Sequence, residues 1–162
     1  MNLTNLQVAL FEPRIPQNTG NIARTSAAFN IPLNLIQPLG FSLESRYLKR
    51  AGLDYWPLVN LTVHSNFSEF NKSMNSHSRI IGFSKSGQLS LQSIEFKKGD
   101  ILLFGREDTG LPKYVRSSCQ LVSSIPMPGG AYNNNQIGVR SLNLSSAVAI
   151  VLYQACLKLE LI

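Results

Sequence analysis

Residues 6–30 read LQVALFEPRIPQNTGNIARTSAAFN and set the class of the fold. The first part, 6–12, is rich in apolar and β-favouring residues and stops at Pro13, which is typical of a buried strand. Residues 19–30 are mostly small and apolar and predict a helix, for which Asn18 can act as the N-cap. Arg24 is unexpected in this helix, because the start of a helix favours an anion over a cation.

The same alternation of strand and helix continues along the chain. Further strands are expected at 32–38, 57–64, 79–84, 100–105 and 120–127, and further helices at 42–52, 65–74, 111–119 and 142–160. This pattern predicts an α/β fold with a mainly parallel sheet and helices on both faces. We expect one domain over 1–162, with no appended RNA-binding domain. The last helix is apolar almost all round and is expected to be buried.

The composition is that of an ordinary soluble globular protein, with 44% hydrophobic and 15% charged residues among 162. No apolar run reaches the roughly 18 residues of a membrane span, and the start of the chain lacks a leader pattern, so we expect a cytoplasmic protein. Cys119 and Cys156 are expected to be reduced core thiols, and His64 and His77 to be surface residues rather than metal ligands. The net charge of +6 fits either a polyanionic partner or a solvated basic surface.

Familiar catalytic motifs are missing from the sequence. It contains no GxxxxGK[ST] phosphate loop, no GxGxxG after the first strand and no GxSxG nucleophile elbow. Polar and glycine-rich stretches instead follow the predicted strands, at 12–24, 84–87, 105–112 and 125–146. Because ligands bind beyond the carboxyl ends of parallel strands, we expect a site there. Glu107 could bind a polar group of a ligand, or it could cap the helix at Leu111 and fix its loop; the sequence leaves both open.

Three of these stretches resemble a known family. NTGNIAR (18–24), LLFGREDTGLP (102–112) and IPM (125–127) with RSLNLSSAVAIVLYQA (140–155) resemble the three motifs of the SPOUT methyltransferases, SpoU/TrmH branch. LKRAGLDYW (48–56) and the short chain make the sequence similar to the small TrmL-type tRNA 2′-O-methyltransferases in particular. Two departures are a longer glycine- and asparagine-rich loop at 128–138, which is expected to be functional or mobile, and Ser146 where asparagine is common.

The resemblance implies a C-terminal deep trefoil knot, a homodimer, and S-adenosylmethionine as methyl donor, with S-adenosylhomocysteine as product. The last helix would then serve both core and dimer interface through Ala147, Val148, Val151, Leu152 and Tyr153. Motif matching assigns the cofactor pocket to Phe83, Gly105, Ile125, Met127, Ser141 and Leu142. Apolar walls suit a flat adenine, and we expect Gly105 to permit close approach of the ligand. No metal and no membrane are expected.

The family assigns catalysis to the arginine of its first motif, here Arg24, with Ser141 and Asn143 orienting the nucleophile. A charged arginine has no acceptor lone pair, so we expect Arg24 to grip a phosphate and stabilise the developing alkoxide. Contacts with tRNA phosphates are expected from six residues: Arg14, Asn18, Arg46, Lys49, Arg50 and Arg140.

The expected function is transfer of a methyl group to the ribose 2′-hydroxyl of the wobble pyrimidine, a cytidine or modified uridine, in the tRNA anticodon loop. Two alternatives stay open at this point. The same reaction could act on ribosomal RNA or on another tRNA position, or the chain could be an RNA-binding module without activity.

Overall fold

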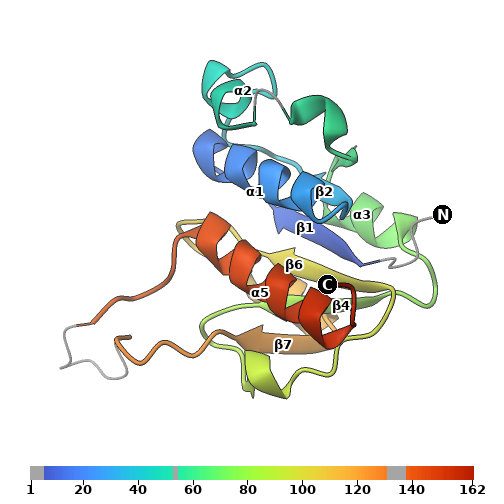
Figure 1. Cartoon of the computed structure of the whole chain (residues 1–162), viewed down its shortest axis with the longest axis vertical. Coiled ribbons are helices and arrows are strands. Elements are labelled where there is room, and N and C mark those ends of the chain that lie inside the picture. Colours follow the sequence, from blue (N-terminus) through green and yellow to red (C-terminus); the bar gives the residue numbers. More distant parts are fainter. Residues whose placement is uncertain (1–5, 53–54, 131–137) are drawn as a thin grey trace.

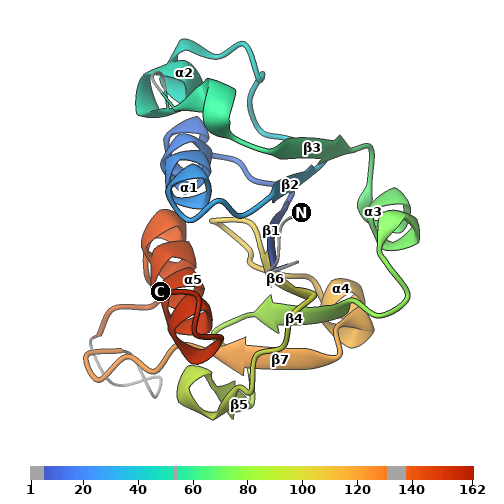
Figure 2. The same cartoon turned by 45° about the vertical axis from the view of Figure 1, so that its right-hand side comes forward.

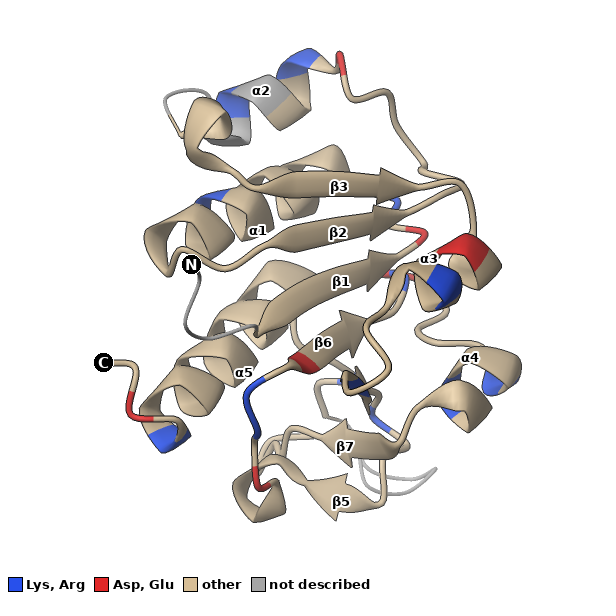
Figure 3. Cartoon of the chain, turned by 90° about the vertical axis from the view of Figure 1, so that its right-hand side faces the viewer, with Lys and Arg blue, Asp and Glu red and all other residues tan. Residues whose placement is uncertain are grey.

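Seven parallel strands form the centre of the molecule. The computed structural model describes residues 6–52, 55–130 and 138–162, without the side chains of residues 49, 51 and 52. The strands are β1 (Gln7–Phe11), β2 (Leu33–Ile36), β3 (Leu61–His64), β4 (Arg79–Phe83), β5 (Leu89–Ser90), β6 (Asp100–Phe104) and β7 (Leu121–Ser124). Their order across the sheet is β3-β2-β1-β6-β4-β7-β5, and all six pairings in the described chain are parallel. Figure 3 shows β3, β2, β1 and β6 in this order, running in the same direction.

Helices cover both faces of this sheet. They are α1 (Pro16–Ala28), α2 (Arg46–Gly52), α3 (Phe67–Ser73), α4 (Lys113–Ser118) and α5 (Leu144–Lys158), with 3-10 turns η1 (Trp56–Leu58) and η2 (Leu91–Ser93). Figure 2 shows α1 and α5 side by side on one face and α3 and α4 on the other. In Figure 1, α2 lies over α1 at the end away from α5. The predicted α/β class, with a parallel sheet covered on both faces, is confirmed.

The strands are buried because both faces of the sheet are covered. Leu10, Ile81 and Leu102 belong to the core beneath α1 and α5. Ile101 and Leu103 alternate with them and belong to the core beneath α3 and α4. The carboxyl ends of β4 and β6 therefore stand at the edge of a rigid core, which is where a ligand site was expected.

Several local predictions are wrong. The first helix begins at Pro16 with Ile15 as N-cap, so Asn18 lies inside α1 rather than capping it. Proline fits the first helical position because its missing N–H is not needed there. Residues 56–58 form η1 before β3, and the short strand β5 was not predicted. His64 is also not at the surface: it is buried on β3, its Nε2 pairs with Asn34 Oδ1 at 2.9 Å, and burial lowers the pKa of its ring.

Helix α5 is buried on one face only, which corrects the expectation for 142–160. Val148, Val151 and Leu152 are fully buried. Ile150, Tyr153 and Leu157 keep 43%, 54% and 50% of their surface exposed. The apolar composition of α5 therefore exceeds what this chain's own core covers.

Other expectations are met or stay open. Both cysteines are free thiols, Cys156 being buried and Cys119 half-buried. Burial raises the pKa of the Cys119 thiol to about 11. No described helix is long and apolar enough to cross a membrane. Most of the loop 128–138 lies outside the described residues, and the knot stays a prediction.

Candidate functional site

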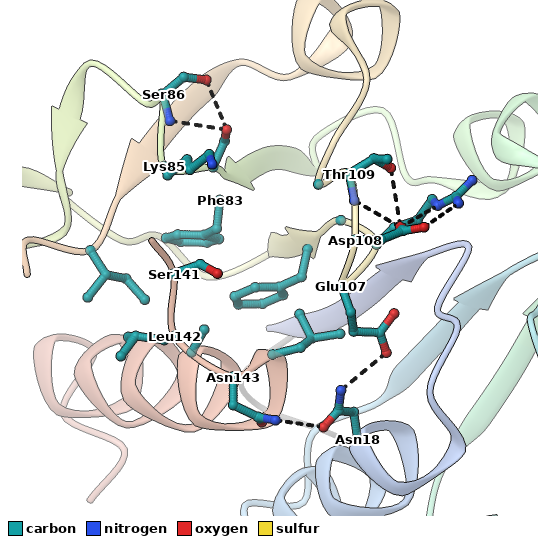
Figure 4. Close-up of a pocket in the computed structure, with 18 of the residues that line it drawn as sticks. Asn18, Phe83, Lys85, Ser86, Glu107, Asp108, Thr109, Ser141, Leu142 and Asn143 are labelled. Atoms are coloured by element: carbon teal, nitrogen blue, oxygen red, sulfur yellow. Dashed lines mark hydrogen bonds and ion pairs between the residues drawn. The ribbon is translucent and has the colours of Figure 1, made fainter. Parts of the chain in front are cut away.

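A cavity of about 530 Å³ opens at the carboxyl ends of β4 and β6 (Figure 4). Loops 84–86 and 105–110 form one side, and residues 141–144, which lead into α5, form the other. Every residue predicted to hold the cofactor lines this cavity: Phe83, Gly105, Ile125, Met127, Ser141 and Leu142. Asn18 and Asn143 line it as well. The fold thus brings together residues that stand more than a hundred positions apart in the sequence.

Stacked aromatic rings form the apolar wall. Phe83 and Phe104 end neighbouring strands and are paired in the register of β4 with β6. Their ring centroids are 4.9 Å apart at an interplanar angle of 16°. Ile125 and Leu142 line the same cavity and are half-buried. Flat and branched apolar surfaces of this kind suit a planar heterocycle.

Glu107 ties the cavity to the start of α1. Its carboxylate accepts hydrogen bonds from the backbone N–H of Arg14 at 2.8 Å and of Ile15 at 3.0 Å, and from Asn18 Nδ2 at 3.3 Å. Ile15 is the N-cap of α1 and offers no capping side chain. Glu107 therefore supplies the acceptor and negative charge that the start of α1 lacks. This differs from the expected cap of the helix at Leu111.

Asn143 continues this network to α5. It is the N-cap of α5, and its Oδ1 accepts from the backbone N–H of Ser145 at 2.9 Å and from Ser145 Oγ at 2.6 Å. Its Nδ2 donates to Asn18 Oδ1 at 3.0 Å. Figure 4 shows Glu107, Asn18 and Asn143 in one chain of hydrogen bonds at the edge of the cavity. These three side chains fix the end of β6, α1 and α5 relative to one another.

Replacing Glu107 with glutamine should loosen this junction. Glutamine keeps the shape but turns one acceptor into an NH₂ donor that faces an N–H. We expect the free energy of unfolding to fall by about 1–3 kcal/mol and the affinity for S-adenosylhomocysteine to fall with it, measured by denaturant titration and calorimetry. Glu95→Gln is the matched control, because Glu95 is exposed and outside the cavity. Unchanged stability in Glu107→Gln would show that the hydrogen bonds of Glu107 do not stabilise this junction.

The fold of its own loop requires a glycine at position 105. An added Cβ would overlap the backbone carbon of Gly110 and the nitrogen of Leu111. Arg106 and Gly110 exchange backbone hydrogen bonds at 3.3 and 2.9 Å, which closes the loop over Gly105. Glycine is therefore needed there to fold loop 105–110, and the close approach of a ligand to Gly105 stays a prediction.

Ion pairs fix the outer side of that loop. Arg106 Nη2 lies 2.7 Å from Asp108 Oδ2, and Arg106 Nη1 lies 3.6 Å from Glu12 Oε2. The hydrogen-bonded guanidinium holds the pKa of the Asp108 carboxyl well below its usual range. Asp108 is therefore ionised at neutral pH and is a weak base there.

The predicted catalytic and RNA-contacting cations do not line the cavity. Arg24 is exposed on α1, with its guanidinium carbon 4.8 Å from the ring centroid of Tyr55. The other four described arginines of the prediction are exposed or half-buried and also outside it: Arg14, Arg46, Arg50 and Arg140. The side chain of Lys49 lies outside the described residues. Asn18 is only 6% exposed and both ends of its amide are engaged, so the structure gives it a positioning task.

Some cavity residues were missed by sequence reasoning. They are Ile15, Ser84, Lys85, Ser86, Phe104, Arg106 and Arg116. Loops 84–87 and 105–112 follow predicted strands, and this position after a strand was the signal that could have identified their residues. No signal in the sequence pointed to Arg116, because it lies on α4, a separate element that the fold brings back to the cavity. No group of three or more potential metal ligands occurs among the described residues.

Known proteins resemble this chain over almost its whole length. The model of the SpoU rRNA methylase family matches residues 5–153. A tRNA (cytidine(34)-2'-O)-methyltransferase from Methylovorus glucosotrophus is 39% identical over 91% of this chain and 92% of its own. One from Photorhabdus asymbiotica is 38% identical over 93% and 91%. A solved structure described as giving insights into the 2-OH methylation of C/U34 on tRNA has a TM-score of 0.88 and 47% identity, over 96% of both chains.

Proposed function

The chain belongs to the SpoU rRNA methylase family, and we propose that it methylates the ribose 2′-hydroxyl of the wobble pyrimidine in the tRNA anticodon loop. The activity that its 38–39% identical relatives are named for supports this substrate. The observation that carries the proposal is the single cavity beyond β4 and β6, which all six expected cofactor residues line together with Asn18 and Asn143.

The cavity fits S-adenosylmethionine in size and chemistry. Its volume of about 530 Å³ lies within the range of small-molecule sites. The adenine would lie against the apolar wall of Phe83, Ile125 and Leu142, and the hydroxyl and amide groups of Ser141 and Asn143 would meet the polar part. When bound, this cofactor supplies an electrophilic methyl group on a sulfonium.

Arg24 would act on the RNA rather than on the cofactor. A guanidinium is charged at all physiological pH values and cannot take a proton, but its N–H groups bind a phosphate bidentately. We assign to Arg24 the binding of the phosphate beside the target ribose and the stabilisation of the developing alkoxide. Ser141 and Asn143 would orient the hydroxyl, with the proton passing to phosphate or water.

We propose that the protein acts as a homodimer and that tRNA contacts both subunits. The exposed side chains of α5, Ile150, Tyr153 and Leu157, form the apolar surface we assign to the interface. Helix α5 lies beside α1 (Figure 2). Arg24 stands on α1 outside the cavity. The target ribose would therefore lie between the mouth of the cavity and that helix. A dimer formed on the α1–α5 face places this route at the interface. Figure 3 shows the basic residues of α2 at the outer corner, where tRNA phosphates would lie.

A charge on that face should separate the subunits. Tyr153→Glu is expected to give a monomer by light scattering, because a buried carboxylate at an apolar interface is costly. Its fold should persist, since Tyr153 is 54% exposed in the single chain, and methyl transfer should fall sharply. Tyr114→Glu, at a 61% exposed tyrosine on α4, is the matched control and should stay dimeric. A Tyr153→Glu protein that remains dimeric would refute this interface.

Transfer of tritiated methyl groups to total RNA tests the class of substrate. Label recovered in tRNA as 2′-O-methylcytidine or 2′-O-methyluridine is the expected result. Label in ribosomal RNA, or at another tRNA position, would select the first alternative. The absence of label, together with the absence of S-adenosylhomocysteine binding by calorimetry, would leave a non-catalytic RNA-binding module.

A further inference from the structure

In the described part of the chain, the arginine to which we assign catalysis contacts a tyrosine ring and no carboxylate. Arg24 lies on the outward side of α1, whose inward side carries Ile22, Ala23 and Ser26. Its guanidinium carbon stands 4.8 Å from the centroid of the Tyr55 ring. Among the described residues it takes part in no ion pair and no side-chain hydrogen bond. The stack on Tyr55 is therefore what defines its position.

An aromatic partner affects an arginine differently from an acidic one. A carboxylate would occupy the N–H groups at the edge of the guanidinium and neutralise its charge. A ring contacts only the flat face, by cation–π attraction, and restricts the motion of the side chain. The edge N–H groups and the full charge stay available. A phosphate that approaches the edge of Arg24 can thus be bound without displacing another partner.

Tyr55 is itself fixed by the chain that follows it. Its carbonyl oxygen accepts from the backbone N–H of Leu58 at 2.8 Å, at the start of η1. The next residue, Trp56, packs against the hydrophobic core beneath α1 and α5. Tyr55 is 40% exposed, so one side of the ring meets Arg24 while part of it faces solvent. A residue anchored in this way can hold a neighbouring side chain in place.

We propose that Tyr55 is a positioning residue for the methyl transfer, which holds the Arg24 guanidinium by its face so that its edge meets the phosphate beside the target ribose. This inference rests on the proposed function. It assigns a task to Tyr55 in the stretch LKRAGLDYW (48–56), which the sequence singled out; Tyr55 does not line the cavity. It also explains how an exposed arginine can be preorganised before RNA binds.

Two variants at Tyr55 and one at Tyr47 test this role. Tyr55→Phe keeps the aromatic face and should keep kcat within about twofold of the parent. Tyr55→Leu removes the face and should lower kcat by about five- to tenfold, with the Kd for S-adenosylhomocysteine unchanged. Tyr47→Leu is the comparison variant: the guanidinium carbon of Arg46 lies 5.0 Å from the Tyr47 ring centroid, Arg46 Nη2 also donates to the Tyr47 hydroxyl at 3.0 Å, and we give Arg46 a binding but no catalytic role. It should alter KM for tRNA and leave kcat near the parental value.

The outcomes separate this inference from the proposed function. A parental kcat in Tyr55→Leu overturns it, and so does an equal loss in Tyr55→Phe, which would assign the effect to the hydroxyl. An equal loss of kcat in Tyr47→Leu would also overturn the inference, because the effect would then be a general one of the RNA-binding surface. If Tyr55→Leu melts early, Tyr55→Trp decides instead, since a larger ring should preserve kcat and a loss of kcat would overturn the inference. A parent protein that does not methylate tRNA refutes the proposed function whatever the Tyr55 variants do.

Discussion

Replacing Arg24 with alanine is expected to slow methyl transfer by roughly 100- to 1,000-fold, the usual cost of removing one group that stabilises a developing oxyanion. The affinity for S-adenosylhomocysteine should stay within about twofold, because Arg24 is outside the cavity that holds the cofactor residues. The fold should not suffer, since the side chain is exposed on α1. Single-turnover transfer to tRNA and calorimetry with S-adenosylhomocysteine measure the two effects separately.

Arg46→Ala is the control for this variant. Arg46 is also an exposed arginine beside a tyrosine ring, to whose hydroxyl it donates a hydrogen bond, but it stands on α2. Its loss should weaken tRNA binding and make that binding less salt-dependent, without changing the rate at saturating tRNA. If Arg24→Ala methylates at close to the parental rate, the catalytic assignment of Arg24 is wrong. If it loses cofactor binding as well, Arg24 acts on the structure of the cavity and not on the RNA.

Replacing Gly105 with alanine should be the most damaging single change to the fold of the site. The added methyl group would overlap the backbone of Gly110 and Leu111, which cannot retreat because the Arg106–Gly110 hydrogen bonds close the loop. Overpacking of this kind costs about 1–3 kcal/mol in the free energy of unfolding. Because Gly105 also lines the cavity, we expect S-adenosylhomocysteine binding to be lost as well.

Gly129→Ala is the matched control, since an added Cβ there meets nothing within 4 Å. It should unfold at the same denaturant concentration as the parent. Chemical denaturation followed by fluorescence gives both midpoints in one experiment. A Gly105→Ala protein as stable as Gly129→Ala would mean that loop 105–110 can move away, and the close packing described for it would not hold.

The sequence was sufficient for the sheet and for the cavity lining. Buried strands followed by helices required parallel pairing, and every described pairing is parallel. The family motifs also selected residues that converge on one cavity. Boundaries were less predictable: Asn18 has the chemistry of an N-cap, but Pro16 begins the helix earlier, and Glu107 supplies the missing acceptor from 92 residues away in sequence from Ile15.

Long-range partners explain the other differences. From the sequence, Glu107 could bind a ligand or cap the helix at Leu111, and its contacts in the structure are with the start of α1, which the pairing of β1 with β6 brings near. Tyr55 could not be matched with Arg24 from the sequence, because nothing in either segment specifies how α1 and η1 meet. The composition of α5 did not predict its exposed face, since an apolar helix can be covered either by its own chain or by another one.

The most direct test of the account uses one tRNA in two forms. The purified protein is given tritium-labelled S-adenosylmethionine and either a tRNA with a wobble pyrimidine or the same tRNA with a 2′-deoxynucleotide at position 34. We predict that label enters the first tRNA as a 2′-O-methylated nucleotide at position 34 and that the deoxy form receives none. Equal labelling of both tRNAs, or label on a base or at another position, would contradict the central claim.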